Sequence, residues 1–231
     1  MVRPLIIGVG GAHSGSGKTA YASLLLRRLR GWGAIKYTKT ALYSSITDDP
    51  GIISMEGKDT QRLLDSGADR VLWVKSPPHA LRDVLHLSIC MLSDLRGIVV
   101  EGNSAIEFVK PDIILFICGS DASRMKESAR KILAMANMVV ASEGQSPDIP
   151  KEVKRFERSI EGKAGLIRCI KEMVDIKVKI RSLLKERSMD KRIPCALARQ
   201  IAEDLHVPYR EVGNAADELD IRITSCELGC F

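Results

Sequence analysis

The octapeptide at residues 12–19, Ala-His-Ser-Gly-Ser-Gly-Lys-Thr, constrains this chain of 231 residues more than any other feature. It matches the phosphate-binding loop of nucleotide-binding proteins, with alanine in place of the first glycine. Glycines let backbone N–H groups point at phosphate oxygens, and the helix that follows the loop offers its positive end. We expect Lys18 to neutralise the terminal phosphates and the Thr19 hydroxyl to ligate Mg²⁺. The predicted nucleotide contacts are Ser14, Gly15, Ser16, Gly17, Lys18, Thr19 and Ala20.

The residues around this loop favour a true phosphate site over a glycine-rich turn that contains Gly-Lys-Thr by chance. Residues 5–9 form an apolar run, and residues 18–29 carry apolar side chains at helical spacing. Similar patterns predict strands at 34–37, 71–74, 97–100, 113–117 and 138–141, and helices at 57–64, 80–92 and 122–136. Buried strands that alternate with helices predict an α/β fold, here a P-loop NTPase whose mainly parallel sheet is covered by helices on both faces. Such sheets bind ligands at the carboxyl ends of their strands.

Carboxylates that follow predicted strands are the candidate ligands for the magnesium ion. Glu101 ends the apolar run at 97–100, so it would project from the carboxyl end of a strand towards the phosphates. Asp48 and Asp49 occupy the loop after the second strand, from which a carboxylate could also reach the metal. The alternatives are a solvated strand end for Glu101 and an ordinary Asp-Asp-Pro-Gly turn for the two aspartates. The predicted Mg²⁺ ligands are Thr19, Glu101 and Asp49.

Three further segments, together with the phosphate loop, carry a family resemblance. They are Ile35-Lys36-Tyr37-Thr38-Lys39, Gly57-Lys58-Asp59-Thr60-Gln61-Arg62 ahead of Ser66-Gly67-Ala68, and Val99-Val100-Glu101-Gly102. With these segments, residues 1 to about 145 resemble the molybdopterin-guanine dinucleotide biosynthesis protein B (MobB) family of P-loop NTPases. The chain departs from the family pattern after its second strand, where a histidine-rich stretch is largely missing, and at Ser54, where an acid usually stands.

The resemblance implies a GTP-binding protein that forms a homodimer and assists the enzymes of molybdenum cofactor biosynthesis. It implies that Lys58 and Asp59 line the nucleotide or partner face. GTP hydrolysis, if it occurs, is expected to be slow or partner-dependent, with Lys18 and Glu101 as the catalytic residues, since positioning and charge neutralisation supply most of such catalysis. ATP remains open as the nucleotide. The turns at 119–121 and 141–143, which follow predicted strands, could present an acceptor to a guanine edge or be plain turns.

Charge and composition divide the chain into three predicted parts. Residues 1–150 carry a near-neutral charge of +3, residues 151–192 a charge of +7, and residues 193–231 a charge of −4. We predict a nucleotide-binding domain at 1–150, a basic helical connector at 151–192 and a winged-helix-like, cysteine-containing module at 193–231. Within the connector, residues 175–180 could instead form a short strand. No apolar run is long enough to span a membrane, and no signal peptide is recognised, so a cytoplasmic protein is expected.

The C-terminal module is expected to contain two helices, at 194–205 and 209–219, and a short strand at 221–224. This helix-turn-helix pattern raises DNA binding as a possibility. Phosphate contacts need basic charge, however, and the second helix holds Arg210 against Glu211, Asp217 and Glu218, so DNA is not the expected partner. Any DNA binding would depend on Lys177, Lys179, Arg181, Lys185, Lys191 and Arg192.

Six cysteines in a chain without a secretory signal are expected to be thiols or metal ligands. A site for Zn²⁺ or an iron–sulfur cluster could form if Cys195, Cys226 and Cys230 converge. The alternative is that these cysteines are small buried residues or belong to a C-terminal tail without a redox role. The alternative function is therefore a nucleotide-switched regulator whose C-terminal module senses a metal or cluster or binds DNA. Cys90, Cys118 and Cys169 lie in apolar patterns and are expected in the core.

Overall fold

The computed structural model describes residues 3–119, 125–142 and 153–225. It divides the chain into two compact units, a first of Arg3–Ile167 and a second that begins at Arg168. The boundary falls within helix α7, Ile160–Arg187. Within the described residues, no helix is both long enough and apolar enough to cross a bilayer.

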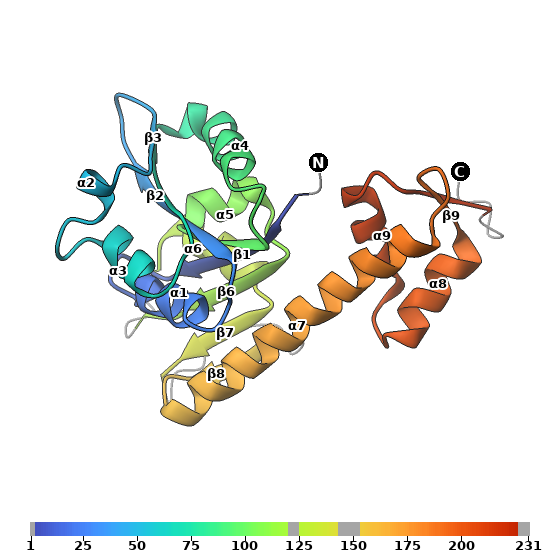
Figure 1. Ribbon diagram of the computed structural model, residues 1–231. Helices are drawn as coiled ribbons and strands as arrows, with labels where there is room; N and C mark the ends of the chain where they lie inside the picture. Colours follow the sequence, from blue (N-terminus) through green and yellow to red (C-terminus); the bar gives the residue numbers. More distant parts are fainter. Residues whose placement is uncertain (1–2, 120–124, 143–152, 226–231) are drawn as a thin grey trace. The chain divides into compact units, whose positions relative to one another are not determined.

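An eight-stranded sheet forms the centre of the first unit (Figure 1). Its strand order is β3-β4-β2-β5-β1-β6-β7-β8, and every neighbouring pair is parallel except β3 with β4. The strands are β1 Leu5–Gly11, β2 Trp32–Lys39, β3 Ser45–Thr47, β4 Val71–Ser76, β5 Gly97–Glu101, β6 Ile113–Ile117, β7 Met138–Ala141 and β8 Lys154–Glu157. All residues of β1, β5, β6 and β7 are buried, which explains why these strands read as continuous apolar runs.

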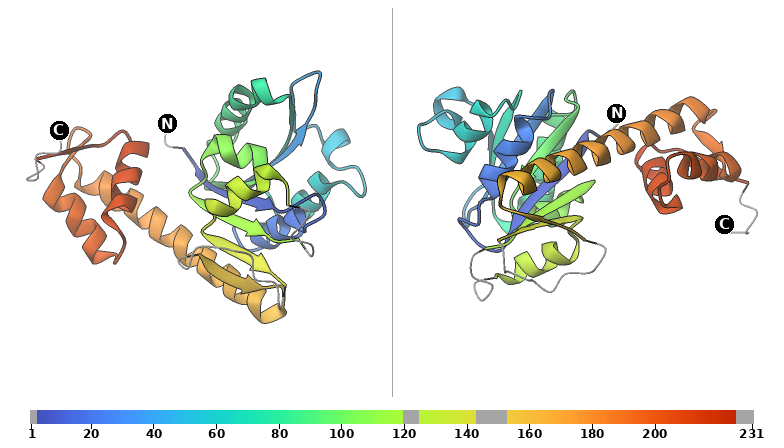
Figure 2. Two further views of the ribbon diagram at one scale, coloured as in Figure 1. Left: turned by 180° about the vertical axis from the view of Figure 1, so that it is seen from behind. Right: turned by 90° about the horizontal axis from the view of Figure 1, so that it is seen from below.

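Helices cover both faces of this sheet (Figure 2). They are α1 Lys18–Leu26, α2 Pro50–Ile53, α3 Asp59–Asp65, the short 3₁₀ helix η1 Pro78–Ala80, α4 Leu81–Met91, α5 Asn103–Val109 and α6 Glu127–Ala134. Helices α4, α5 and α6 pack on one face, where two clusters of buried side chains join them to the strands, and α1 and α3 lie together on the other. The predicted α/β fold with a mainly parallel, doubly covered sheet is therefore confirmed.

Several elements were not expected from the sequence. The structure adds β3, α2, α5 and β8, and β8 is a polar edge strand with the sequence Lys-Arg-Phe-Glu and mostly exposed side chains. Charge on an edge strand discourages pairing with other chains, and it also removes the alternation that would reveal the strand. The suggestion of a strand at 175–180 was wrong, because these residues are helical within α7.

The second unit has a small core of its own. After α7 it contains β9 Arg192–Pro194, α8 Cys195–Asp204, α9 Tyr209–Glu218 and β10 Arg222–Thr224. Its buried residues come from all of these elements and from α7, and they include Ile180, Leu184, Ile193, Ile201 and Val212. The two predicted helices and the short strand are confirmed. The strands β9 and β10 pair in parallel and flank the two helices, which differs from the antiparallel hairpin of a wing.

Acidic residues of the second unit are paired with basic residues of the same unit. Glu211 accepts a hydrogen bond from the Lys177 ammonium at 2.8 Å, and Arg181 pairs with Glu218 at 2.5 Å. Lys191 pairs with Asp220 at 2.6 Å. Three of the six basic side chains on which DNA binding would depend are therefore engaged with carboxylates of their own unit.

Candidate nucleotide-binding site

The loop at residues 12–17 joins the carboxyl end of β1 to the first turn of α1. Gly15 has a φ of +82° and Gly17 a φ of +102°, a left-handed conformation that side-chain-bearing residues rarely adopt. A Cβ atom on Gly11 would lie 2.3 Å from the Ser16 hydroxyl oxygen, so the end of β1 must also be glycine. The positions of these glycines therefore follow from the backbone path and from close packing inside the loop.

Buried polar atoms without partners gather at this loop. Among the described residues, four buried side-chain atoms lack a hydrogen-bond partner: His13 Nε2, Ser16 Oγ, Tyr21 Oη and Arg158 Nε. His13 and Ser16 belong to the loop, Tyr21 lies one residue past Ala20 on α1, and Arg158 donates a hydrogen bond to the loop. Buried polar groups are normally satisfied, so their concentration in one place indicates a site that takes a polar ligand.

The Lys18 side chain folds back over the loop and donates a hydrogen bond to the His13 carbonyl oxygen at 2.8 Å. Burial lowers the pKa of Lys18, and although Glu101 opposes that shift, the nearby Lys36 and Lys126 lower the pKa further. The ammonium group is thus partly desolvated, with the carboxylates of Glu101 and Asp59 as well as two other lysines nearby. An anion bound beside it would favour its charged form.

A charged cluster lies beside the loop, where β5 ends. The Thr19 hydroxyl lies 3.0 Å from each oxygen of the Glu101 carboxylate, whose side chain is only 2% exposed. The Lys36 ammonium lies 2.5 Å from Glu101 and 2.7 Å from Asp59. The register of the sheet explains this arrangement, because Lys36 of β2 is the direct partner of Glu101 on β5.

Asp59, the first residue of α3, supplies the second carboxylate of this cluster. Burial on its own would raise the pKa of Asp59, but hydrogen bonds from Lys36 and Thr19 and the charge of Arg62 outweigh it, so the pKa lies below its usual range. Asp59 is therefore held as a carboxylate. A threonine hydroxyl with one or two carboxylates is a suitable donor set for Mg²⁺, which takes its remaining ligands from phosphate and water.

The structure does not bring Asp49 to this cluster. Its carboxylate caps α2 by accepting a hydrogen bond from the Gly51 N–H at 2.8 Å, and Asp48 instead lies 3.7 Å from Arg70. Both aspartates therefore fit the alternative of an ordinary Asp-Asp-Pro-Gly turn better than a role as metal ligands. An aspartate before proline is a good helix cap. Lys58 points elsewhere too, with its ammonium 4.8 Å from the centre of the Trp73 ring.

Arg158 is the site residue that sequence reasoning missed. It follows β8, which β6 and β7 separate from β1 in the sheet, yet its guanidinium reaches the phosphate loop. One nitrogen, Nη2, donates to the carbonyl oxygens of Ser16 at 2.9 Å and Cys118 at 2.5 Å. No local pattern marks this arginine, because the contact spans 142 residues in sequence.

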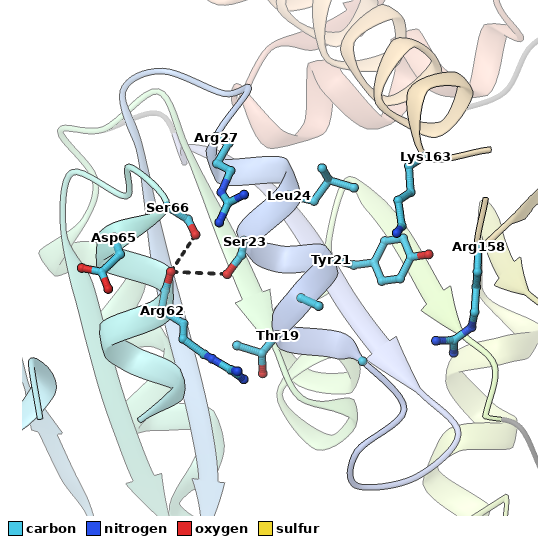
Figure 3. Close-up of a pocket in the computed structure, with 12 residues that line it drawn as sticks. Thr19, Tyr21, Ser23, Leu24, Arg27, Arg62, Asp65, Ser66, Arg158 and Lys163 are labelled. Carbon is cyan, nitrogen blue, oxygen red and sulfur yellow. Dashed lines mark hydrogen bonds between the residues drawn. The ribbon is translucent and has the colours of Figure 1, made fainter. Parts of the chain in front are cut away.

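A groove of about 640 Å³ starts at the phosphate loop and follows α1 (Figure 3). Arg62, Asp65 and Ser66 lie on one side of the helix, and Arg158 and Lys163 lie on the other. The remaining lining residues are Gly17, Thr19, Ala20, Tyr21, Ser23, Leu24 and Arg27. The groove thus includes three of the predicted nucleotide-binding residues, Gly17, Thr19 and Ala20. Its four cations against one carboxylate favour an anionic occupant.

The cysteines show no comparable assembly. Cys118 and Cys169 are buried, as expected, whereas Cys90 is exposed on α4, so its assignment to the core was wrong. Cys195 is partly exposed at the start of α8, and the other two members of the predicted zinc or iron–sulfur site, Cys226 and Cys230, lie outside the described residues. Within the part of the chain that the structure describes, no three histidine, cysteine or acidic side chains are placed to bind a metal ion.

Comparisons with known proteins find likenesses in structure. No family model matches the chain, and no curated protein matches it in sequence. Among solved structures, HypB from Helicobacter pylori in complex with nickel is similar, at a TM-score of 0.48 and 10% sequence identity, over 74% of this chain and 87% of that one. The argument for function therefore rests on the geometry of the site.

Proposed function

We propose that this protein binds a guanine nucleoside triphosphate together with Mg²⁺ at the loop of residues 12–19. The observation that carries this proposal is the junction of the loop with the Thr19–Glu101–Lys36–Asp59 cluster. The partly buried Lys18 and the glycine-rich loop, with its unpartnered Ser16 hydroxyl, are suited to bind phosphate. The Thr19 hydroxyl, beside two carboxylates, is suited to bind the metal ion.

Each residue of the site has a distinct part in this proposal. Backbone N–H groups of the loop and the Lys18 ammonium bind phosphate oxygens, and the first turn of α1 adds its positive end. Thr19, Glu101 and Asp59 would hold Mg²⁺, which neutralises phosphate charge when bound. Lys36 holds the two carboxylates together and balances their charge. We assign Asp59 to this set in place of Asp49, because Asp59 is the carboxylate that shares Lys36 with Glu101.

We further propose that the chain serves molybdenum cofactor maturation as a homodimer, with slow or partner-dependent GTP hydrolysis. The support is the MobB-like segment at 57–62, whose Asp59 belongs to the charged cluster. In a reconstituted reaction that attaches GMP to molybdopterin, the chain should raise the yield and the Lys18→Ala variant should not. Equal yields with and without the chain, or fast GTP hydrolysis by the purified chain alone, would contradict this role.

A nucleotide panel read by thermal unfolding tests the binding proposal. GTP with Mg²⁺ at a hundred times its Kd should stabilise the full chain by about 2.7 kcal/mol, a rise in melting temperature of roughly 5–10 °C. ATP should give a smaller rise, and Lys18→Ala should abolish it for both nucleotides. Lys110→Ala, which changes an exposed lysine at the end of α5, is the matched control and should respond like the wild type. Equal shifts for ATP and GTP would overturn the guanine assignment, and no shift for either would overturn nucleotide binding.

A further inference from the structure

The Arg158 side chain has donors beside the phosphate loop that no described residue accepts from. Its guanidinium lies beside the phosphate loop, with Nη1 3.6 Å from where a Gly17 Cβ atom would stand. Only Nη2 has hydrogen-bond partners among the described residues, the two carbonyl oxygens of Ser16 and Cys118. Nε is buried and unpartnered. A guanidinium has five N–H donors in a planar fork, so Arg158 keeps donors that are unused among the described residues and that a ligand could use.

Tyr21 supplies a second, independent observation in the same groove. The residue is 4% exposed, and its hydroxyl has no hydrogen-bond partner. Figure 3 shows the ring pointing from α1 towards the side on which Arg158 and Lys163 lie. Burial raises the pKa of Tyr21, while the charge of Arg158 acts in the opposite direction, which agrees with their proximity. A buried tyrosine hydroxyl normally finds a partner, and here a ligand hydroxyl would provide one.

The groove that contains Arg158 and Tyr21 also extends to the phosphate loop. Gly17, Thr19 and Ala20 form its end at the first turn of α1, beside the helix N-terminus at which phosphate would bind. Arg158 and Lys163 bring positive charge to one side of the groove. Arginine binds phosphate oxygens through paired donors, and a hydroxyl can both donate to and accept from a sugar hydroxyl.

We propose that this groove holds the α-phosphate and sugar of the bound nucleotide, with Arg158 binding the phosphate oxygens and the Tyr21 hydroxyl bonding a ribose hydroxyl. The proposal rests on the proposed function, because it needs a nucleotide at the phosphate loop. It adds to that function a cation from outside the loop and a group that distinguishes ribose from a sugar without hydroxyls. Arg158 also connects the loop to the residue after β6, through its hydrogen bonds to Ser16 and Cys118.

Binding of GTP and of 2′,3′-dideoxy-GTP to the full chain, measured by calorimetry with Mg²⁺, tests the proposal. Arg158→Gln should raise the Kd for both nucleotides at least about tenfold, and Arg158→Lys should recover part of the loss. Tyr21→Phe should raise the Kd for GTP roughly three- to tenfold and leave the Kd for the dideoxynucleotide unchanged, because only GTP has the hydroxyl to lose. Arg30→Gln, an exposed arginine beyond the other end of α1, is the control and should bind like the wild type.

The outcomes separate this proposal from the one on which it rests. If the wild type binds GTP in a Lys18-dependent way while Arg158→Gln and Tyr21→Phe bind equally well, the groove assignment is overturned and nucleotide binding stands. An equal loss for GTP and dideoxy-GTP in Tyr21→Phe overturns the assignment of its hydroxyl to the sugar. A wild type that binds no nucleotide overturns both proposals. Melting temperatures without ligand identify any variant that fails to fold, and Arg158→Lys then carries the test, because it keeps the charge and loses the fork.

Discussion

The charge balance beside the phosphate loop depends on Glu101. This carboxylate is almost completely buried, and it is acceptable there because Lys36 pairs with it and Thr19 donates to it. Lys36 in turn holds Asp59, so a single ammonium joins two carboxylates from different elements. At the scale of single residues, the site is therefore a set of charges that compensate one another and that a bound metal ion would rearrange.

Substitution of Glu101 should affect stability and metal dependence together. Glu101→Gln keeps the shape but leaves the partly buried Lys36 with one carboxylate instead of two, so the free energy of unfolding should fall by about 1–3 kcal/mol. The variant should also lose most of the gain in nucleotide affinity that Mg²⁺ gives. Denaturant unfolding and calorimetric titration with and without Mg²⁺ measure the two effects. Glu107→Gln removes a carboxylate that is 44% exposed on α5 and should change stability by less than about 0.5 kcal/mol. A Glu101→Gln variant that keeps the full effect of Mg²⁺ would rule out Glu101 as a metal ligand.

Single residues of the candidate site could be named from the sequence where one local motif contains them. Lys18 and Thr19 follow from the loop itself, and Glu101 follows from its place after an apolar run. Asp49 and Asp59 could not be ranked in this way, because both stand at helix starts and only tertiary pairing with Lys36 distinguishes them. Arg158 could not be predicted from the sequence, since its contact with the loop depends on the path of the chain through β7 and β8.

At the scale of elements, the end of β1 fixes how closely the loop can turn. Gly11 stands where the strand meets the loop, and a Cβ atom there would come within 2.3 Å of Ser16 Oγ and 3.1 Å of the Ile117 carbonyl oxygen of β6. The first contact could be relieved only by moving a side chain of the loop, and the second involves backbone. The strand end and the loop therefore act as one structural element.

Gly11→Ala tests this tight junction. The added methyl group should lower the free energy of unfolding by about 1–3 kcal/mol and weaken nucleotide binding, because Ser16 must move. Gly213→Ala is the matched control, since Gly213 lies inside α9 with nothing within 4 Å of its Cβ position. Helix propensity predicts that this control gains up to about 1 kcal/mol. Denaturant unfolding of both variants gives the comparison, and a Gly11→Ala variant as stable and as active in binding as the wild type would contradict the account.

Elements were predictable where burial imposed a pattern. The central strands β1, β5, β6 and β7 are apolar throughout because helices cover both sides. The helices α1, α4 and α6 followed from the spacing of their apolar residues, whereas the short α5 was not expected. The polar edge strand β8 and the short elements β3 and α2 carry no such pattern, since they bury little. They are set by pairing with neighbouring strands and by capping, which local sequence shows only weakly.

At the scale of the whole molecule, the two units differ in what their charges do. In the first unit, four cations line the groove beside the phosphate loop against one carboxylate. In the second, three of the basic side chains that could contact DNA are paired with carboxylates of the same unit. The pairs are Lys177–Glu211, Arg181–Glu218 and Lys191–Asp220. The expectation that DNA is not the partner came from the acidic residues of α9, and it stays a prediction.

Amide hydrogen exchange of the full chain tests most directly whether backbone N–H groups of the loop bind phosphate. With GTP and Mg²⁺, amides in peptides that cover residues 13–20 should exchange more slowly than in the free protein, because hydrogen bonds to phosphate protect them. The Lys18→Ala variant should show no such protection at the same nucleotide concentration. Unchanged exchange at residues 13–20 in the wild type, with nucleotide bound and protection confined to other segments, would contradict the account.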